Sequence, residues 1–131
     1  VVEHQLIGPS QWRHCGGMIF PGEQLMRSAL AQGTAQLPWS DAEVESLPLR
    51  TDTAIATGVH WAQLGAVTEF VRSVIGVRAT TPRLVLHGGN AFKYKGLISQ
   101  LLAPWCVEVD EEAVFRGLWL HWRHQRKLEA Q

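Results

Sequence analysis

Residues 84–102, LVLHGGNAFKYKGLISQLL, contain the order of features that decides the fold class. Residues 84–86 are a short apolar run typical of a strand that is buried on both faces. A turn follows at residues 88–90, and leucine and isoleucine then recur on one side of a helix that Pro104 ends. A strand, a glycine turn and a helix in this order predict helices packed on a sheet.

The upstream segments extend this pattern. Residues 1–7 and 12–20 are apolar or β-branched stretches joined by a Gly-Pro-Ser turn, which predicts a hairpin of two strands. Helical spacing then predicts a helix over about residues 23–32, with Gly33 in the left-handed conformation that often ends helices. Residues 34–50 show no clear period and predict an ordered loop.

The longest helical pattern covers residues 52–75, where apolar side chains point in many directions and predict a central, mostly buried helix. Small residues form a stripe along it: Ala54, Gly58, Ala62 and Gly65. Such a stripe lets a second helix approach closely, and the partner can come from this domain or from a second subunit.

The downstream end predicts one more strand and one more helix. Residues 105–109 form the strand, and Asp110 is placed to cap the helix. This helix is expected to pack through Val114, Phe115, Leu118, Trp119 and Trp122. The full order is two strands and a helix, a long helix, and two strand-helix units. It predicts a single α/β domain over residues 1–131 with a mixed sheet.

The amino-acid composition argues against some kinds of binding partner. Twelve basic and twelve acidic residues cancel, so we expect neither nucleic acid nor a membrane as a partner. The apolar runs are far shorter than the roughly 20 residues of a membrane span. Cys15 and Cys106 are typical of buried thiols in a reducing compartment, which favours the cytoplasm. The start at Val1 and Val2 suggests a piece of a longer polypeptide.

The turn at Gly88, Gly89 and Asn90 is the strongest local signal for a ligand site. Ligands of open α/β sheets bind beyond the carboxyl ends of strands, although two glycines can equally serve the turn alone. His87 beside the turn can line a pocket or simply end the strand. The spacing of the six histidines matches no metal site, and no serine or cysteine lies in a nucleophile motif.

Five segments, in order along nearly the whole chain, resemble the type III pantothenate kinase family, which also contains the Bvg accessory factors. They are GGMIFPG at residues 16–22, GTAQLP at 33–38, TAIATGV at 53–59, LHGGNA at 86–91 and VFRGL at 114–118. The resemblance implies a ribonuclease H-like domain of the actin, Hsp70 and acetate kinase superfamily. It also implies a cytoplasmic homodimeric enzyme that phosphorylates pantothenate with ATP, the first step of coenzyme A synthesis.

The resemblance assigns roles to individual residues. Thr34 is expected to contact pantothenate from across the dimer, with Gly33 setting its backbone. Gly88, Gly89 and Asn90 are expected to lie along the adenosine. Two departures put nucleotide affinity in doubt, because His87 stands where the family has a small residue or threonine and Asn90 where it often has aspartate.

The resemblance also implies what this chain lacks. The catalytic aspartate, the phosphate-binding motif and the segment that binds a monovalent cation, K⁺ or NH₄⁺, are expected upstream of Val1. The chain is therefore expected to be the C-terminal domain of a two-domain kinase, with ATP and Mg²⁺ as co-substrate and no catalytic or metal-binding residue of its own. The alternative is a non-catalytic accessory or regulatory protein on the same fold.

Overall fold

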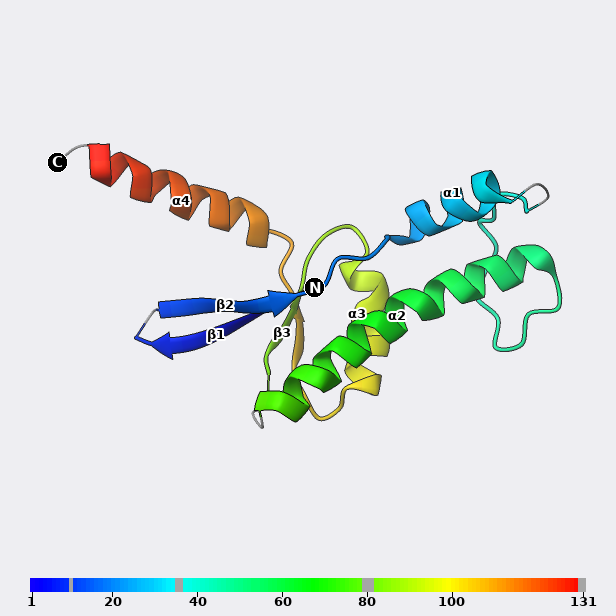
Figure 1. Cartoon of the computed structure of the whole chain (residues 1–131), viewed down its shortest axis with the longest axis horizontal. Coiled ribbons are helices and arrows are strands. Elements are labelled where there is room, and N and C mark those ends of the chain that lie inside the picture. Colours follow the sequence, from blue (N-terminus) through cyan, green and yellow to red (C-terminus); the bar gives the residue numbers. More distant parts are fainter. Residues whose placement is uncertain (10, 35–36, 79–81, 130–131) are drawn as a thin grey trace. The chain divides into compact units, whose positions relative to one another are not determined.

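The computed structural model describes residues 1–9, 11–34, 37–78 and 82–129. Its elements follow the predicted order (Figure 1). They are β1 (Val2–Gly8), β2 (Gln11–Gly17), α1 (Glu23–Gly33), α2 (Thr51–Arg78), β3 (Leu84–Leu86), α3 (Ala91–Leu101), β4 (Val107–Val109) and α4 (Ala113–Glu129). The chain divides into two compact units, residues 1–79 and 80–131, and each is described by itself.

The first unit begins with the predicted hairpin. β1 and β2 pair antiparallel, with Val2 opposite Gly17 and Gly8 opposite Gln11. A Cβ on Gly17 would lie 2.7 Å from the backbone oxygen of Val1, closer than real Cβ atoms come to backbone. The close pairing of the two strands therefore explains a glycine at the end of β2.

Helix α1 packs against α2, the long helix drawn in green (Figure 1). Apolar residues of α2 form the core of this unit: Ile55, Ala56, Val59, Leu64 and Val71. An ion pair joins the last turn of α2 to the hairpin, with Arg78 Nε 2.8 Å from Glu3 Oε1. The periodicity over residues 52–75 thus predicted the helix, but the expectation that it is mostly buried is wrong, since nine of its 28 residues are buried.

One expectation about α1 is wrong, and one about α2 is met by no helix in the described part of this chain. Gly33 is the last residue of α1 and is not left-handed. The chain leaves the helix at Thr34 instead, whose backbone is extended, with φ −128° and ψ 140°, and whose hydroxyl bonds the Leu30 carbonyl. The small-residue stripe is exposed within this chain, because no described atom lies within 4 Å of where a Cβ on Gly58 or Gly65 would be. Helix α1 therefore contacts α2 without closing on the stripe. A close partner from a second subunit stays a prediction.

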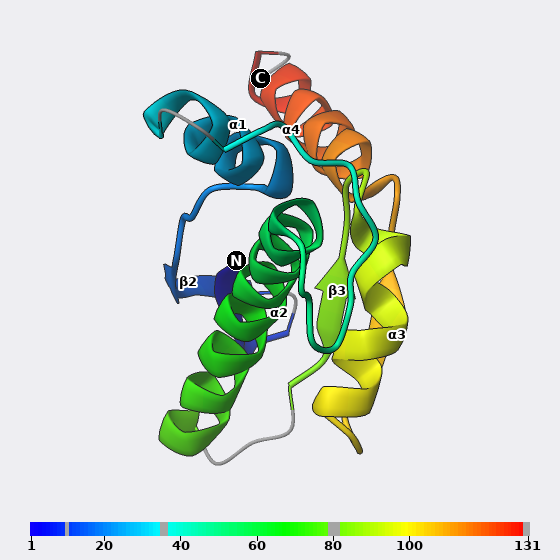
Figure 2. The same ribbon diagram turned by 90° about the vertical axis from the view of Figure 1, so that its right-hand side faces the viewer.

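The second unit contains a parallel pair of short strands. β3 pairs with β4 from Leu84 opposite Val107 to Leu86 opposite Val109. Helix α3 lies beside this pair (Figure 2) and contacts β4. The buried residues between them are mostly apolar: Leu84, Tyr94, Ile98, Leu102 and Val107. This strand, turn and helix arrangement is the one that residues 84–102 predict.

The predicted mixed sheet is not formed by the described residues. They contain two separate two-stranded sheets, one antiparallel and one parallel, because each strand bonds only its partner within its own unit. Since β3 has one partner strand and one covering helix, it is not buried on both faces, and Val85 is 46% exposed. The structure does combine helices with small sheets, as the predicted α/β class requires.

Helix α4 is more exposed than the sequence predicts. Asp110 accepts a hydrogen bond from the Glu112 backbone N–H in the turn before the helix, which begins at Ala113, so Asp110 lies three residues before α4. All five expected packing residues are exposed in the described part of the chain, however, since no described segment of this unit covers them. Trp61 on α2 is exposed as well.

Two further expectations concern membrane-spanning helices and the burial of the two cysteine side chains. Among the described residues, no helix combines the length and the apolar character needed to cross a membrane. Cys106 is exposed and Cys15 is half-buried, so the expectation of buried thiols is wrong. Short strands explain this result, because β4 begins after Cys106 and β2 has only one neighbouring strand.

Candidate functional site

Thr34 lies directly after the last residue of α1 and is exposed. Its Oγ1 donates a hydrogen bond to the Leu30 carbonyl at 2.7 Å and accepts one from the Leu37 backbone N–H at 3.3 Å. A hydroxyl has one hydrogen and two acceptor lone pairs. No other described residue bonds this hydroxyl, so one lone pair is left among the described contacts. Toward a ligand Thr34 can then accept a hydrogen bond but not donate one.

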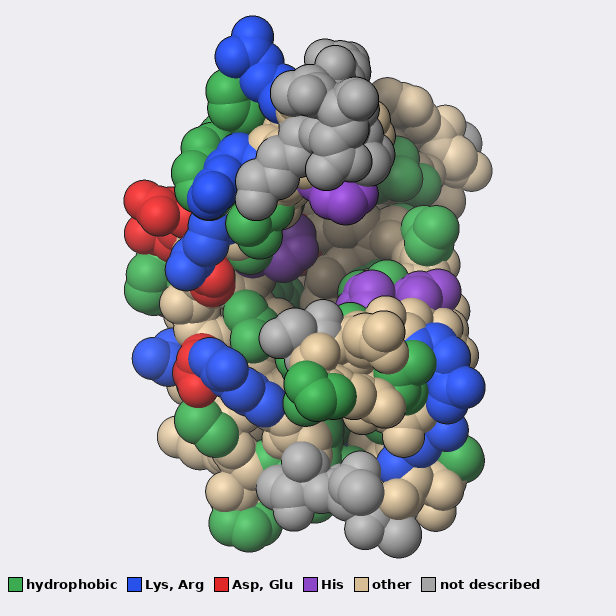
Figure 3. All heavy atoms as spheres, turned by 90° about the vertical axis from the view of Figure 1, so that its left-hand side faces the viewer, with side chains coloured by type: hydrophobic (Ala, Val, Ile, Leu, Met, Phe, Trp, Pro, Cys, Tyr) green, Lys and Arg blue, Asp and Glu red, His purple; other side chains and the backbone are tan. Residues whose placement is uncertain are grey.

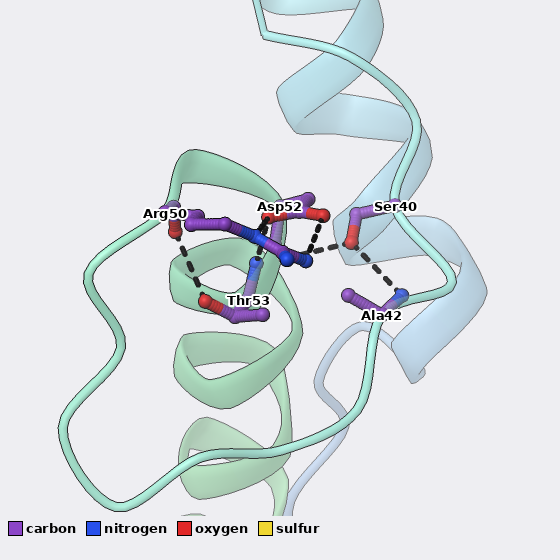
Figure 4. Close-up of polar contacts among 5 residues, drawn as sticks. All are labelled: Ser40, Ala42, Arg50, Asp52 and Thr53. Carbon is purple, nitrogen blue, oxygen red and sulfur yellow. Dashed lines mark hydrogen bonds and ion pairs between the residues drawn. The ribbon is translucent and has the colours of Figure 1, made fainter.

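The loop that follows Thr34 is fastened to both helices at Ser40. The buried Arg27 side chain of α1 donates to the Ser40 carbonyl. The Ser40 hydroxyl donates to the Asp52 carbonyl at 2.6 Å and accepts from the Ala42 backbone N–H at 3.2 Å (Figure 4). Ser40 is 2% exposed, so these bonds form away from water.

A second attachment lies at Thr57, on the buried face of α2. Its Oγ1 accepts from the Glu45 backbone N–H at 3.0 Å and donates to the Glu45 carbonyl at 3.2 Å. Residues 37–50 contain no helix or strand, and backbone groups without such partners need other ones. The hydroxyl groups of Ser40 and Thr57 provide some of these hydrogen-bond partners.

An ion pair marks the first turn of α2 beside Ser40. Arg50 donates from Nε and Nη2 to both carboxylate oxygens of Asp52, at 3.0 and 2.7 Å (Figure 4). These hydrogen bonds, helped by the Thr53 backbone N–H, lower the pKa of the Asp52 carboxyl. Negative charge at Asp52 suits the positive end of the helix dipole.

An apolar groove of about 660 Å³ runs between α1 and α2. Leu25, Met26 and Ala29 form part of one side, and Ala54, Gly58 and Ala62 of the small-residue stripe lie on the other. Leu30 and Leu37, which flank Thr34, also line it. Apolar walls suit an apolar group far better than a phosphate or carboxylate, which needs donors or positive charge.

The glycine turn lies at the carboxyl end of β3, in the second unit. Gly88 has a φ of 94°, a conformation that favours glycine, so the turn itself requires this residue. Gly89 has an ordinary φ, and no described atom is within 4 Å of where its Cβ would be. The geometry of the turn therefore requires a glycine at position 88 but not at position 89.

His87 and Asn90 border this turn, and both are exposed. Asn90 precedes α3 as its N-cap residue. Histidine side chains also reach the surface elsewhere (Figure 3). Over the described ranges, no three His, Cys, Asp or Glu side chains gather into a group that could hold a metal ion.

The structure thus brings the predicted site residues together in two sets. Gly33 and Thr34 are adjacent at the end of α1, and Gly88, Gly89 and Asn90 form the turn before α3. Sequence reasoning missed Arg27, Ser40 and Thr57. A signal for Thr57 existed, since it is a polar residue among the apolar positions of the long helix.

Known proteins resemble this chain in sequence. The sequence model of the family described as "Type III pantothenate kinase" matches residues 7–73, just over half of the chain and including Thr34. The type III pantothenate kinase of Halorhodospira halophila is 37% identical over 118 residues, which cover 88% of this chain and 44% of that protein. That of Bordetella petrii is 51% identical over 63 residues, 48% of this chain and 24% of that protein.

Helices with small sheets, and a glycine turn after a parallel strand, define the class as α/β. The chain belongs to the type III pantothenate kinase family. It spans less than half the length of the relatives described above.

Proposed function

We propose that this chain is the C-terminal, ribonuclease H-like domain of a two-domain enzyme that transfers a phosphoryl group from ATP to pantothenate. The family match over residues 7–73 is the observation that supports this function most directly. The names of the relatives agree with it, since each is called a type III pantothenate kinase. The reaction would be the first step of coenzyme A synthesis and would take place in the cytoplasm.

Pantothenate is assigned to the end of α1. Thr34 is exposed there, with one unused acceptor lone pair on its hydroxyl. Pantothenate carries hydroxyl and amide groups that can donate to such an acceptor. Gly33 contributes by giving the chain beside Thr34 no side chain, which keeps the approach open.

Adenosine is assigned to the glycine turn. Gly89 has open space where a Cβ would be, so the flat face of a nucleoside can approach the backbone there. Gly88 is needed for the turn, and Asn90 is exposed beside it and offers an amide to the ligand. His87 at the edge of the turn is a polar neighbour that can tune nucleotide affinity.

The ions and catalytic groups of the reaction are assigned to other parts of the full-length protein. The family resemblance is the reason for placing Mg²⁺ and the monovalent cation there. Phosphoryl transfer needs metal-bound phosphates and a residue that orients the nucleophile. In this chain we therefore assign binding and positioning roles only.

A second copy of the enzyme is assigned to the groove between α1 and α2. Its small-residue stripe is exposed, and the groove walls are apolar. Burying apolar surface stabilises association, by roughly 25 cal/mol for each Å² removed from water. A dimer formed there would bring a second protomer close to Leu30 and Leu37, on either side of Thr34.

A coupled kinase assay of the full-length protein tests this function. We expect ADP release that requires both ATP and pantothenate, and phosphorylated pantothenate as the product. A folded dimer that binds pantothenate or ATP without turnover would contradict the enzyme and favour the accessory or regulatory role.

A further inference from the structure

We propose that Ser40 and Thr57 are positioning residues, whose hydroxyl groups hold residues 37–50 on α2 and thereby fix Thr34 for its substrate. We call this pair the hydroxyl clasp. The proposal rests on the proposed function, in which Thr34 contacts pantothenate. It adds two residues that do not touch the substrate and act through the loop.

Ser40 is the first point of the clasp, and it joins three segments of the chain. Its carbonyl accepts from Arg27 of α1, and its hydroxyl bonds both Asp52 of α2 and Ala42 of the loop. Both Ser40 and Arg27 are buried. Because an unpaired buried polar group is costly, this arrangement strongly favours one position of the loop.

Thr57 is the second point of the clasp. Its single hydroxyl bonds both backbone groups of Glu45, as a neighbouring strand would do. Thr57 is buried on α2, whose regular helix gives it a fixed place. The middle of the loop is therefore held to α2 independently of Ser40.

Ser40 is linked to Thr34 by a short stretch of chain and by one hydrogen bond. Six residue steps span at most about 20 Å when fully extended. The Thr34 hydroxyl is also bonded to Leu37, only three residues before Ser40. When Ser40 leaves its place on α2, Leu37 moves with it, and the hydrogen bond that orients the Thr34 hydroxyl is disturbed.

Misplacement of a binding group has a measurable effect on an enzyme. A displacement of about 1 Å can reduce the rate by roughly 100-fold. Loss of the clasp acts on the pantothenate side, because both clasp residues and Thr34 belong to the first unit. The glycine turn assigned to adenosine belongs to the second unit, so ATP binding is expected to change little.

The test compares two buried threonines of the same helix in the full-length protein. Thr57→Val removes a hydroxyl that holds the loop, whereas Thr68→Val removes one that bonds only carbonyls of its own helix, at Leu64 and Gly65. Steady-state kinetics would give the KM for pantothenate and for ATP separately. We expect Thr57→Val to raise the pantothenate KM about tenfold or more and leave the ATP KM within about twofold. Thr68→Val should change neither.

Two further variants make the test specific. Thr57→Ser keeps the hydroxyl and should keep the wild-type pantothenate KM. Ser40→Ala should behave like Thr57→Val, and if it does not fold, the Thr57 and Thr68 pair still decides the question.

The outcomes separate this proposal from the proposed function. If pantothenate turnover is present and Thr34→Val raises the pantothenate KM, but Thr57→Val behaves like Thr68→Val, the clasp is overturned and the function stands. An equal rise in both KM values for Thr57→Val would show a general loss of structure and also overturn it. Absence of pantothenate turnover in the folded wild-type protein overturns both.

Discussion

Thr57 and Glu45, twelve residues apart, exchange two hydrogen bonds through a single hydroxyl group. The Glu45 N–H lies 3.0 Å from Thr57 Oγ1, and the Glu45 carbonyl lies 3.2 Å from it. Both backbone groups of Glu45 are therefore hydrogen-bonded, as they would be in a sheet, although the loop contains no helix or strand. The Thr57 side chain, on helix α2, makes the two hydrogen bonds that a neighbouring strand would make in a sheet.

This pairing predicts a difference in stability between two threonine variants. Thr57→Val leaves both Glu45 backbone groups without this partner and should lower the free energy of unfolding by about 1–3 kcal/mol. Thr68→Val should lower it less, because the carbonyls that Thr68 bonds belong to its own helix. Urea unfolding followed by circular dichroism would measure both, and equal losses would contradict the special role of Thr57.

Thr34→Val should raise the KM for pantothenate and leave that for ATP almost unchanged. The variant removes the acceptor lone pair at nearly constant side-chain size. Steady-state kinetics of the full-length protein with each substrate varied in turn would show the split.

The Thr34 hydroxyl also bonds the Leu30 carbonyl in the last turn of α1, so a control is needed. Thr34→Ser keeps the bonds to Leu30 and Leu37 and should restore the pantothenate KM. If Thr34→Val leaves the pantothenate KM at the wild-type value, Thr34 is not a substrate contact.

Gly88 and Gly89 should respond differently to substitution. Gly88→Ala forces a side chain into a φ of 94° and should destabilise the fold by about 1–3 kcal/mol. Gly89→Val places its side chain in open space, so the fold should tolerate it while ATP binding weakens through contact with the nucleoside. Thermal unfolding and ATP titration would separate the two effects. Unchanged ATP affinity in Gly89→Val would remove the adenosine assignment.

Gly58→Ala should stabilise the first unit by about 0.5–1 kcal/mol, because alanine is the better helix former and no described atom opposes its Cβ. Gly17→Ala should have the opposite effect, since its Cβ would lie 2.7 Å from the Val1 oxygen. Denaturant unfolding of both variants would check the two signs.

Gly58→Leu tests the proposed dimer surface. The leucine side chain would extend into the groove between α1 and α2, where a second copy is proposed to bind. Sedimentation of the full-length protein should show weaker dimerisation than in the wild type. An unchanged association constant, with the fold intact, would place the dimer contact elsewhere.

Glu108 should titrate below its ordinary pKa of 4.5, because Arg83 donates to both of its carboxylate oxygens, at 3.1 and 2.6 Å. Arg83→Gln should move this pKa back toward 4.5, as measured by NMR of the side-chain carboxyl. A lowered folded-state pKa means that the pair stabilises the fold above the ordinary pKa. That contribution is lost as the pH falls through the lowered value.

Local periodicity was enough to predict the elements. The apolar spacing over residues 52–75 lies within α2, and residues 84–102 contain β3, the glycine turn and α3. Helix and strand patterns repeat over a few residues, so neighbours in sequence determine them. The family motifs were equally visible, because they are short runs of specific residues.

Packing between distant segments was not predictable in this way. The sequence favoured a close helix partner for Gly58 from this domain or from a second subunit, and the sequence did not show that within this chain Gly58 lines an open groove. Likewise, periodicity implied that Trp119 and Trp122 would be covered, and both are exposed in the described residues. An apolar face shows that a side chain can be buried, whereas the surrounding segments decide whether it is.

The sequence by itself determined the order of helices and strands, the family, and the candidate residues Thr34 and Gly89. Only the tertiary structure decided how these residues are held. The bonds from Arg27 to Ser40, Ser40 to Asp52, and Thr57 to Glu45 join a loop without period to helix residues more than ten positions away. Such contacts depend on where the folded chain brings polar groups together away from water, and no local pattern encodes that.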